Sequence, residues 1–135
     1  MLYAHTSITL DEHWLPGNIE NARIYLASPY TSTDPAVMEW RYKKALEALH
    51  FFLKKRLTIY SPIVHSHEAG LLGGLPVAFN FWGKHCLSFL EHWATEIWTL
   101  QIPGILESVG VKAEMDYCAG MNKHFVHRAI YFPKY

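Results

Sequence analysis

The chain has 135 residues, and half of them are hydrophobic, which suits one ordinary domain with a packed core. Twelve Lys and Arg residues balance twelve Asp and Glu residues, so duplex nucleic acid and anionic membrane, which bind basic surfaces, are poor candidates as partners. We find no secretory signal pattern and no apolar run of roughly 20 residues that would span a bilayer.

Two further features of the composition bear on compartment and assembly. Cys86 and Cys118 lie far apart and form no CxxC pair, which predicts reduced core thiols in a cytoplasmic protein. Zero net charge and an aromatic content of 15% favour self-association, so we expect a homodimer or a higher homo-oligomer.

The first third of the chain contains an arm, a strand and a helix. Residues 1–20 alternate only weakly and contain a Pro-Gly turn, so we expect an irregular N-terminal arm with one short strand, packed across a sheet edge or reaching a second subunit. Residues 23–28 form an apolar run that stops at a proline, as a buried parallel strand does. Asp34 as N-cap and Pro35 at the first helical position predict a helix over about 35–55.

The rest of the chain alternates in the same way. We expect a strand over 57–63, then a long loop over 64–83 with four glycines and one proline, of the kind that is often functional. The remaining elements are a helix at 84–95, a strand at 96–102, a helix at 109–122 and a strand at 127–133.

This alternation predicts a single doubly wound α/β domain, Rossmann- or flavodoxin-like, with a mainly parallel sheet of four to five strands. The domain covers residues 21–135, after the arm over 1–20. Ligands of such sheets bind beyond the carboxyl ends of the strands, at the point where the strand order reverses. The segments that follow the first three strands of the domain should therefore meet there and form the site.

The segment over 108–114 contains the strongest chemical signal. Ser108 begins a helix whose free amides predict an anion site. Glu114 lies about two turns further along, on the apolar face that Val111, Met115 and Cys118 define. A carboxylate on an apolar face is costly unless it is paired or used. The alternative is an ordinary glutamate exposed on the helix surface.

Three motifs in chain order support a family resemblance. IYLASPY, YSPIVHSH and S-x-G-V-x-x-E resemble the nucleoside 2-deoxyribosyltransferase-like superfamily over residues 22–133, and most of all the 2′-deoxynucleoside 5′-phosphate N-hydrolases and small phage and bacterial domains of unassigned activity. The resemblance implies that Glu114 attacks the anomeric carbon of the sugar, that Tyr25 positions this carboxylate, and that Ser108 holds the 5′-phosphate. Carboxylate attack at a sugar carbon is the chemistry of retaining glycosidases.

The resemblance implies an N-glycosidase for a nucleoside or a nucleoside 5′-monophosphate that needs no cofactor and no metal. The alternatives are a base-exchanging deoxyribosyltransferase and a non-catalytic binder of nucleotides or nucleotide-derived signals. We expect the substrate to contact residues from the loop after each strand and from the first helix: Ser28, Tyr30, Thr31, Arg41, His65, His67, Trp82, Ser108 and Gly110.

One residue of the family pattern is absent. The relatives carry an Asp on or just before the second helix, whereas this chain has only Asp11, Asp34 and Asp116. The corresponding position falls near Cys86, Leu87 or Ser88. Either Glu68, His65 or His67 supplies the acid that the leaving base needs, or the pocket only binds its ligand.

Several candidate residues also have other readings. His65 and His67 would share one side of a strand-like segment, where they would serve as hydrogen-bonding groups in the pocket, as half of a metal site, or as exposed residues. Arg41 either reaches a phosphate or is a solvated helix residue. Trp82, with its neighbours Phe79 and Phe81, either stacks on a base or covers the core.

Overall fold

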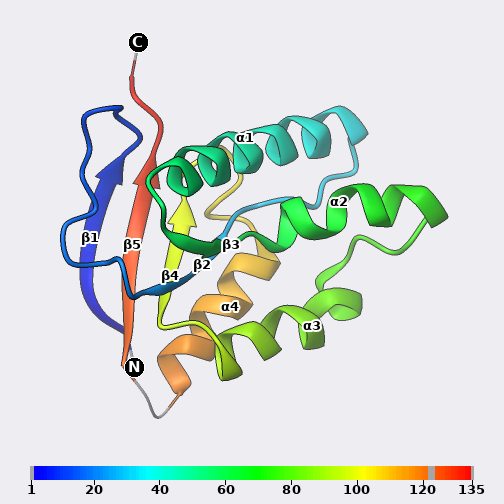
Figure 1. Cartoon of the computed structure of the whole chain (residues 1–135). Coiled ribbons are helices and arrows are strands. Elements are labelled where there is room, and N and C mark those ends of the chain that lie inside the picture. The colour runs from blue at the N-terminus through cyan, green and yellow to red at the C-terminus, as the bar shows by residue number, and fades with distance from the viewer. Residues whose placement is uncertain (1, 122–123, 135) are drawn as a thin grey trace.

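Across residues 2–121 and 124–134, which the computed structural model describes, five parallel strands form one sheet in the order β1-β5-β4-β2-β3 (Figure 1). The strands are β1 (Leu2–Thr9), β2 (Arg23–Ala27), β3 (Thr58–Tyr60), β4 (Glu96–Leu100) and β5 (Phe125–Tyr131). The helices are α1 (Pro35–Lys54), α2 (Pro62–Gly73), α3 (Phe79–His92) and α4 (Val109–Gly120). The predicted doubly wound α/β fold is confirmed.

Alternation along the central strands decides which helix each side chain meets. In β2, Ile24 and Leu26 point into the core that α1 covers, together with Ala45 and Phe52 of that helix. Tyr25 and Ala27 point to the opposite face, which α3 and α4 cover. Tyr25 is therefore directed toward α4, the helix that carries Glu114.

Polar caps set where three of the helices begin. The Asp34 carboxylate accepts a hydrogen bond from the Ala36 N–H at 2.9 Å, and Pro35 follows at the first helical position. The Ser61 hydroxyl caps α2 in the same way, through the Val64 N–H at 3.1 Å. The Ser108 hydroxyl caps α4 through the Val111 N–H, also at 3.1 Å.

The predicted loop over 64–83 is wrong, because most of it is helical. Ser61 and Pro62 start α2 directly after β3, and Gly74, at φ +66°, ends it in the left-handed conformation that glycine adopts without strain. α3 then begins at Phe79, earlier than predicted. Only the short connection over 74–78 remains as a loop. The predicted helix over 109–122 ends at Gly120, and its residue 122 lies outside the described residues.

The arm over 1–20 was expected to be irregular with one short strand, but the strand takes up most of its first half. β1 pairs in parallel with β5 from Leu2 opposite Phe125 to Thr9 opposite Tyr131, and so forms a full edge strand of the sheet. Backbone hydrogen bonding to β5 provides the regularity that the side-chain pattern lacks. The arm was expected to pack across a sheet edge or to reach a second subunit, whereas β1 forms that edge itself.

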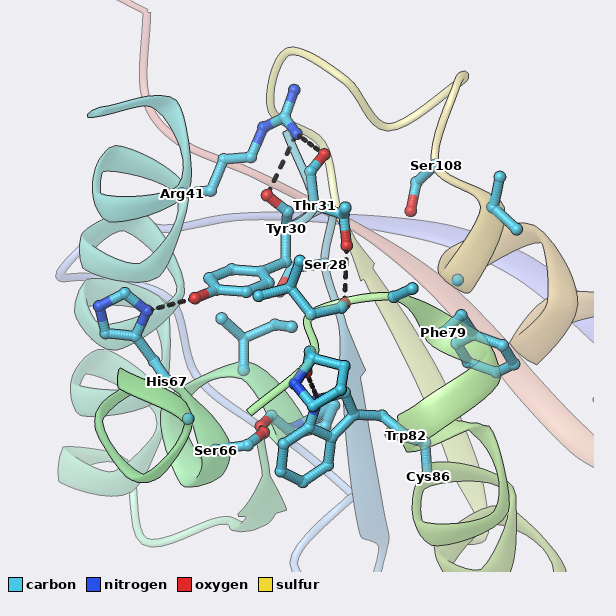
Figure 2. A pocket seen from close by; sticks show the side chains of 18 of the residues that line it. Ser28, Tyr30, Thr31, Arg41, Ser66, His67, Phe79, Trp82, Cys86 and Ser108 are labelled. Atoms are coloured by element: carbon cyan, nitrogen blue, oxygen red, sulfur yellow. Dashed lines mark hydrogen bonds between the residues drawn. The ribbon is translucent and has the colours of Figure 1, made fainter. Parts of the chain in front are cut away.

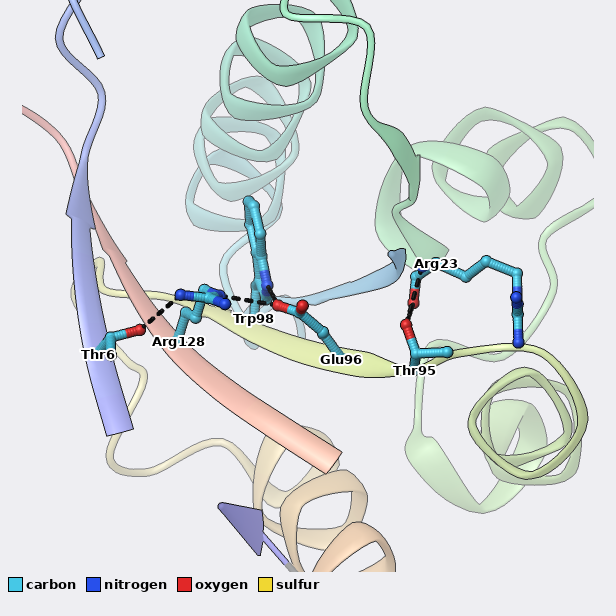
Figure 3. A network of polar contacts seen from close by, with 6 residues as sticks. All are labelled: Thr6, Arg23, Thr95, Glu96, Trp98 and Arg128. Atoms are coloured by element: carbon cyan, nitrogen blue, oxygen red, sulfur yellow. Dashed lines mark hydrogen bonds and ion pairs between the residues drawn. The ribbon is translucent and has the colours of Figure 1, made fainter. Parts of the chain in front are cut away.

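A polar network centred on the buried carboxylate of Glu96 ties β1, β5 and β4 together (Figure 3). The Glu96 carboxylate accepts a hydrogen bond from the Trp98 indole N–H and another from Arg128 Nε, each at 2.8 Å. Arg128 Nη1 in turn donates to the Thr6 hydroxyl at 3.1 Å. The network links three strands on the α1 side of the sheet, and it pairs the buried carboxylate of Glu96 with a cation.

Replacing Arg128 by methionine is expected to lower the free energy of unfolding by about 2–3 kcal/mol, because Glu96 then keeps a single donor in a buried position. Urea unfolding monitored by tryptophan fluorescence measures this loss. The control is Lys112→Met, which breaks an exposed ion pair with Asp116 and should change stability by less than about 0.5 kcal/mol. Equal effects of the two substitutions would contradict the structural role of the network.

No helix among the described residues combines the length and the apolar character needed to cross a lipid bilayer.

Candidate active site

A pocket of about 1060 Å³ lies at the carboxyl end of the sheet (Figure 2). The loops after β2 and β4 form part of it, and α2, the connection over 74–78 and the first turns of α3 and α4 form the rest. β3 lies on one side of β2 and β4 on the other, so the chain changes direction across the sheet at this point. The pocket is therefore where a doubly wound sheet places its ligand, and it is large enough for a nucleotide-sized molecule.

Most of the predicted site residues lie together in this pocket. Its lining includes Ser28, Tyr30, Thr31, Arg41, His67, Trp82, Ser108, Gly110 and Glu114. Tyr25 is behind the wall and contacts the pocket through Glu114. His65 does not line it.

Glu114 and Tyr25 form a buried pair. The Tyr25 hydroxyl donates a hydrogen bond to Glu114 Oε2, and the Glu114 side chain belongs to a residue that is only 4% exposed. Burial raises the pKa of Glu114 to about 8, while the hydrogen bond from Tyr25 acts in the opposite direction. Burial, and next to it the charge of Glu114, raises the pKa of Tyr25, which therefore stays a donor. The alternative of an exposed surface glutamate is wrong.

Cys86 lies at the same place, about two turns into α3 and on its buried face. It lines the pocket, and its thiol contacts the Tyr25 hydroxyl. Burial, followed by the nearby Glu114 carboxylate, raises the pKa of Cys86 to about 11, so the group is a neutral thiol. In the region where the resembled family carries an aspartate, this pocket therefore has an apolar and weakly acidic side chain.

One corner of the pocket has the chemistry of an anion site. Arg41 Nη1 donates to the backbone carbonyls of Thr31 at 2.9 Å and Tyr30 at 3.3 Å, while its Nε is buried without a hydrogen-bond partner. No carboxylate within the described ranges pairs with this guanidinium. The Ser28 hydroxyl is likewise buried and unpartnered. Polar groups in this state bind a ligand or carry a desolvation cost.

The N-terminus of α4 faces the same corner through Ser108 and Gly110. The first amides of a helix have no acceptor within the helix, and the helix dipole favours an anion there. Gly104, in the loop before α4, has φ +102° and lies so close to Arg41 that a Cβ would collide with the guanidinium. Glycine at this position therefore lets the loop close over the arginine.

The two histidines of the HxH motif diverge. The expectation that they share one side is wrong, because the segment is helical and residues two apart are rotated by roughly 200°. His67 points into the wall of the pocket, where its Nδ1 is 2.6 Å from the Tyr30 hydroxyl and its Nε2 is 2.8 Å from Glu39 Oε2. His65 instead stacks on His85, with ring centroids 5.3 Å apart.

No group of three or more potential metal-ligating side chains gathers within residues 2–121 and 124–134.

The opposite wall of the pocket is aromatic and belongs to α3 and the connection before it. The Trp82 indole N–H donates to the Pro76 carbonyl at 2.7 Å, and the Thr31 hydroxyl donates to the Val77 carbonyl at 3.1 Å (Figure 2). Phe79 packs on Gly110, where a Cβ would lie 3.1 Å from its ring. Trp82 and Phe79 thus present an apolar surface on which a flat base can stack.

Sequence reasoning misses Glu39, which contacts His67 from α1. In the sequence, a functional carboxylate on the polar side of an amphipathic helix looks the same as an ordinary solvent-exposed glutamate. The helical nature of α2, in contrast, has a readable signal, since Ser61 and Pro62 are a cap and a first-turn proline, as Asp34 and Pro35 are for α1.

Comparison with known proteins gives a family but no activity. None of the curated proteins compared with the chain matches it. A family model described as "Domain of unknown function (DUF1937)" matches residues 22–129, from the start of β2 into β5, and therefore includes every residue placed in the pocket above. The chain belongs to this DUF1937 family of domains of unknown function.

Proposed function

We propose that this protein is an N-glycosidase that cleaves the base–sugar bond of a nucleoside 5′-monophosphate, with Glu114 as nucleophile. The observation that carries the proposal is the buried Glu114–Tyr25 pair on the wall of a nucleotide-sized pocket. Burying a carboxylate costs folding free energy, and a hydrogen bond from a phenol offsets only part of that cost. Such an arrangement is typical of active sites.

The chemistry follows from the charge that develops on the sugar. Loss of the base passes through an oxocarbenium-like state, and a carboxylate next to the anomeric carbon stabilises this cation and can trap it as a covalent intermediate. Water then releases the sugar. Tyr25 fixes the orientation of the carboxylate through Oε2, and the other oxygen, Oε1, is the one available for attack.

Arg41, Ser28 and the first turn of α4 form the part of the pocket suited to the 5′-phosphate. A guanidinium without a carboxylate partner beside a helix N-terminus attracts a dianion. The aromatic wall of Phe79 and Trp82 is suited to the base. Glu114 lines the same pocket and is suited to the sugar. The base, the sugar and the phosphate therefore each have a chemically matched part of the pocket.

Replacing Arg41 by glutamine is expected to raise KM for nucleoside monophosphates by about 10–100-fold, because a hydrogen bond from a charged group contributes about 1.5–3 kcal/mol. The corresponding nucleosides, which lack the phosphate, should be turned over as before. Steady-state kinetics with paired substrates measures the difference. Lys54→Gln, at the far end of the same helix, is the control. If KM for nucleosides rises as much as KM for monophosphates, Arg41 does not recognise phosphate.

The function itself is tested with a panel of deoxynucleoside and ribonucleoside 5′-monophosphates, in which free base is separated by chromatography. We expect release from at least one of them by the unmodified protein and by Asp116→Asn, an exposed carboxylate on the same helix. Glu114→Gln should release none. If a correctly folded protein releases no base from the whole panel, the glycosidase proposal fails. Adding a second free base and looking for an exchanged nucleotide separates a transferase from a hydrolase.

A second candidate is a binder of nucleotides without catalysis. It is favoured by Cys86, a neutral thiol in the region where the resembled enzymes carry an acid. This candidate predicts that a nucleotide raises the melting temperature of the protein while no product forms. It also predicts that Glu114→Gln binds that nucleotide as well as the parent does.

Two expectations about the setting of this activity accompany the proposal. Neither Cys86 nor Cys118 forms a disulfide, which supports a reducing compartment such as the cytoplasm. Leu106 and Val109 lie close to Ser108 in the sequence, at the start of α4, and are 93% and 75% exposed. Two large apolar side chains in contact with solvent support a homo-oligomer that covers them.

A further inference from the structure

We propose that Tyr30 donates the proton that the departing base requires, and that His67 and Glu39 supply this proton and hold the donor in place. The inference rests on the proposed function, because it assigns a second role within the same reaction. It concerns three residues from separate segments: the loop after β2, the second turn of α2 and the first turns of α1.

The three side chains form a continuous hydrogen-bonded chain, and Figure 2 shows its part from His67 to Tyr30 in the pocket. Glu39 Oε2 lies 2.8 Å from His67 Nε2, and His67 Nδ1 lies 2.6 Å from the Tyr30 hydroxyl. Because a carboxylate only accepts, Nε2 carries a proton and donates it to Glu39. The second nitrogen therefore faces the hydroxyl of Tyr30, a residue that lines the pocket.

The hydrogen-bonded chain of Glu39, His67 and Tyr30 is held in place from several sides. His67 is 6% exposed, and the ring of Tyr42 stacks on it with centroids 4.0 Å apart. The Tyr30 ring packs edge-on against the same imidazole, and Arg41 binds the Tyr30 backbone carbonyl. Lys43 lies 3.9 Å from the other oxygen of Glu39. A proton donor must be fixed in this way to act in a transition state.

The pocket has few other groups that could protonate a base. The Tyr25 hydroxyl is committed to Glu114, and the Cys86 thiol contacts that same hydroxyl, whereas Tyr30 is paired with an imidazole that can replace its proton. Glu107 is the one other carboxylic acid that lines the described pocket, and it is an exposed residue next to the N-terminus of α4. Burial, and next to it the charge of Glu39, raises the pKa of Tyr30, which keeps its hydroxyl protonated.

The proton transfer balances as follows. When His67 carries a proton on both nitrogens, Nδ1–H donates to the Tyr30 oxygen, and the phenolic O–H is free to donate to the base. As the bond between the anomeric carbon and the base nitrogen breaks, its electron pair stays on the nitrogen, which takes the Tyr30 proton. Tyr30 takes the Nδ1 proton, and His67 becomes neutral. The water that later releases the sugar from Glu114 gives up a proton, which restores His67.

The test compares two leaving groups in the same phosphorylated deoxyribose. A natural base needs a proton to leave, whereas 4-nitrophenolate is a stable anion and needs none. We expect Tyr30→Phe to lower kcat/KM for the natural substrate by about 100-fold or more and to change kcat/KM for the nitrophenyl substrate by less than about 3-fold. Glu39→Gln should show a smaller loss with the same selectivity, because it weakens the donor without removing it.

Two variants serve as comparisons. Tyr117→Phe removes a hydroxyl that is bonded to Glu91 and does not belong to the pocket lining, and should leave both reactions unchanged. Glu107→Gln removes the rival acid, and should not distinguish the two leaving groups. The melting temperature and the nucleotide affinity of each variant are measured alongside, so that a loss of folding or binding is recognised.

The outcomes separate the two proposals. If the unmodified protein cleaves neither substrate, the proposed function fails and the donor role fails with it. If it cleaves both, and Tyr30→Phe lowers the two rates equally or not at all, only the donor role is overturned. A selective loss in Glu107→Gln in place of Tyr30→Phe would also overturn it.

Discussion

Glu114→Gln is expected to abolish base release and to stabilise the folded protein at neutral and alkaline pH. Loss of the nucleophile should reduce kcat by at least about 10⁴-fold, since an amide neither attacks the sugar nor neutralises its charge. The gain in stability has a separate cause. Burial raises the pKa of Glu114 from 4.5 to about 8, so the folded protein at intermediate pH holds a proton that the unfolded chain has lost.

The sign of the pH dependence follows from this proton. Below about pH 4.5 the carboxyl is protonated in both states and costs no stability. Between about pH 4.5 and 8 the folded state binds more protons, so the free energy of unfolding falls as the pH rises. The fall ends above about pH 8, where both states are ionised. Glutamine removes this dependence, so the variant should exceed the parent by roughly 2–4 kcal/mol at pH 8.

Urea unfolding at pH 5, 6, 7 and 8 measures the effect for the parent, for Glu114→Gln and for Asp116→Asn. The last of these removes an exposed carboxylate from the same helix and should keep the parental pH dependence. A Glu114→Gln protein that is less stable than the parent at pH 8 would contradict the raised pKa. Retained base release in that variant would contradict the nucleophile.

Tyr25→Phe is expected to lower the rate at pH 7 by about 10–100-fold and to move the active pH range upward. The Tyr25 hydroxyl lowers the pKa of Glu114, so its removal raises that pKa further above the ordinary value and reduces the fraction of nucleophile that is ionised. The 4-nitrophenyl substrate isolates this effect, because its leaving group needs no proton. With the parent, kcat/KM should rise with pH and level off near 8.

The measurement is a pH–rate profile of kcat/KM with that substrate. In Tyr25→Phe the plateau should begin at a higher pH than in the parent. Tyr117→Phe, also on the α4 side but with its hydroxyl at Glu91, should keep the parental profile. An unchanged or lower midpoint in Tyr25→Phe would show that the phenol does not stabilise the ionised carboxylate.

Much of the fold could be predicted because its signals are local. The apolar run from Arg23 to Ala27, with a proline soon after it, predicts a buried strand from its own residues. Asp34 and Pro35 start a helix through contacts within four residues. The meeting of Tyr25 and Glu114 was implied by the family resemblance, and the structure shows its local basis. Alternation in β2 and the apolar face of α4 each direct one of these side chains to the same layer.

The errors arose where local signals compete. The four glycines within residues 64–83 favour a loop by composition, whereas Ser61 and Pro62 favour the start of a helix. The structure follows the second signal, because α2 and the first turn of α3 are helical. β1 has weak alternation and becomes a strand through its hydrogen bonds to β5, which lies more than 110 residues away in the chain. The divergence of His65 and His67 follows directly from the helix that was missed.

The residue pattern by itself determined the α/β alternation apart from β1 and α2, and it determined the carboxyl end of the sheet as the place of the site. Both depend on periodicity and caps, which act over a few residues, whereas the Tyr25–Glu114 pair was implied by the family resemblance. Only the tertiary structure decided that Cys86 lies beside Tyr25, that Arg41 lacks a carboxylate partner within the described residues, and that Glu39, His67 and Tyr30 form one chain. These contacts join segments far apart in the sequence, and packing between helices, which leaves no local pattern, sets them.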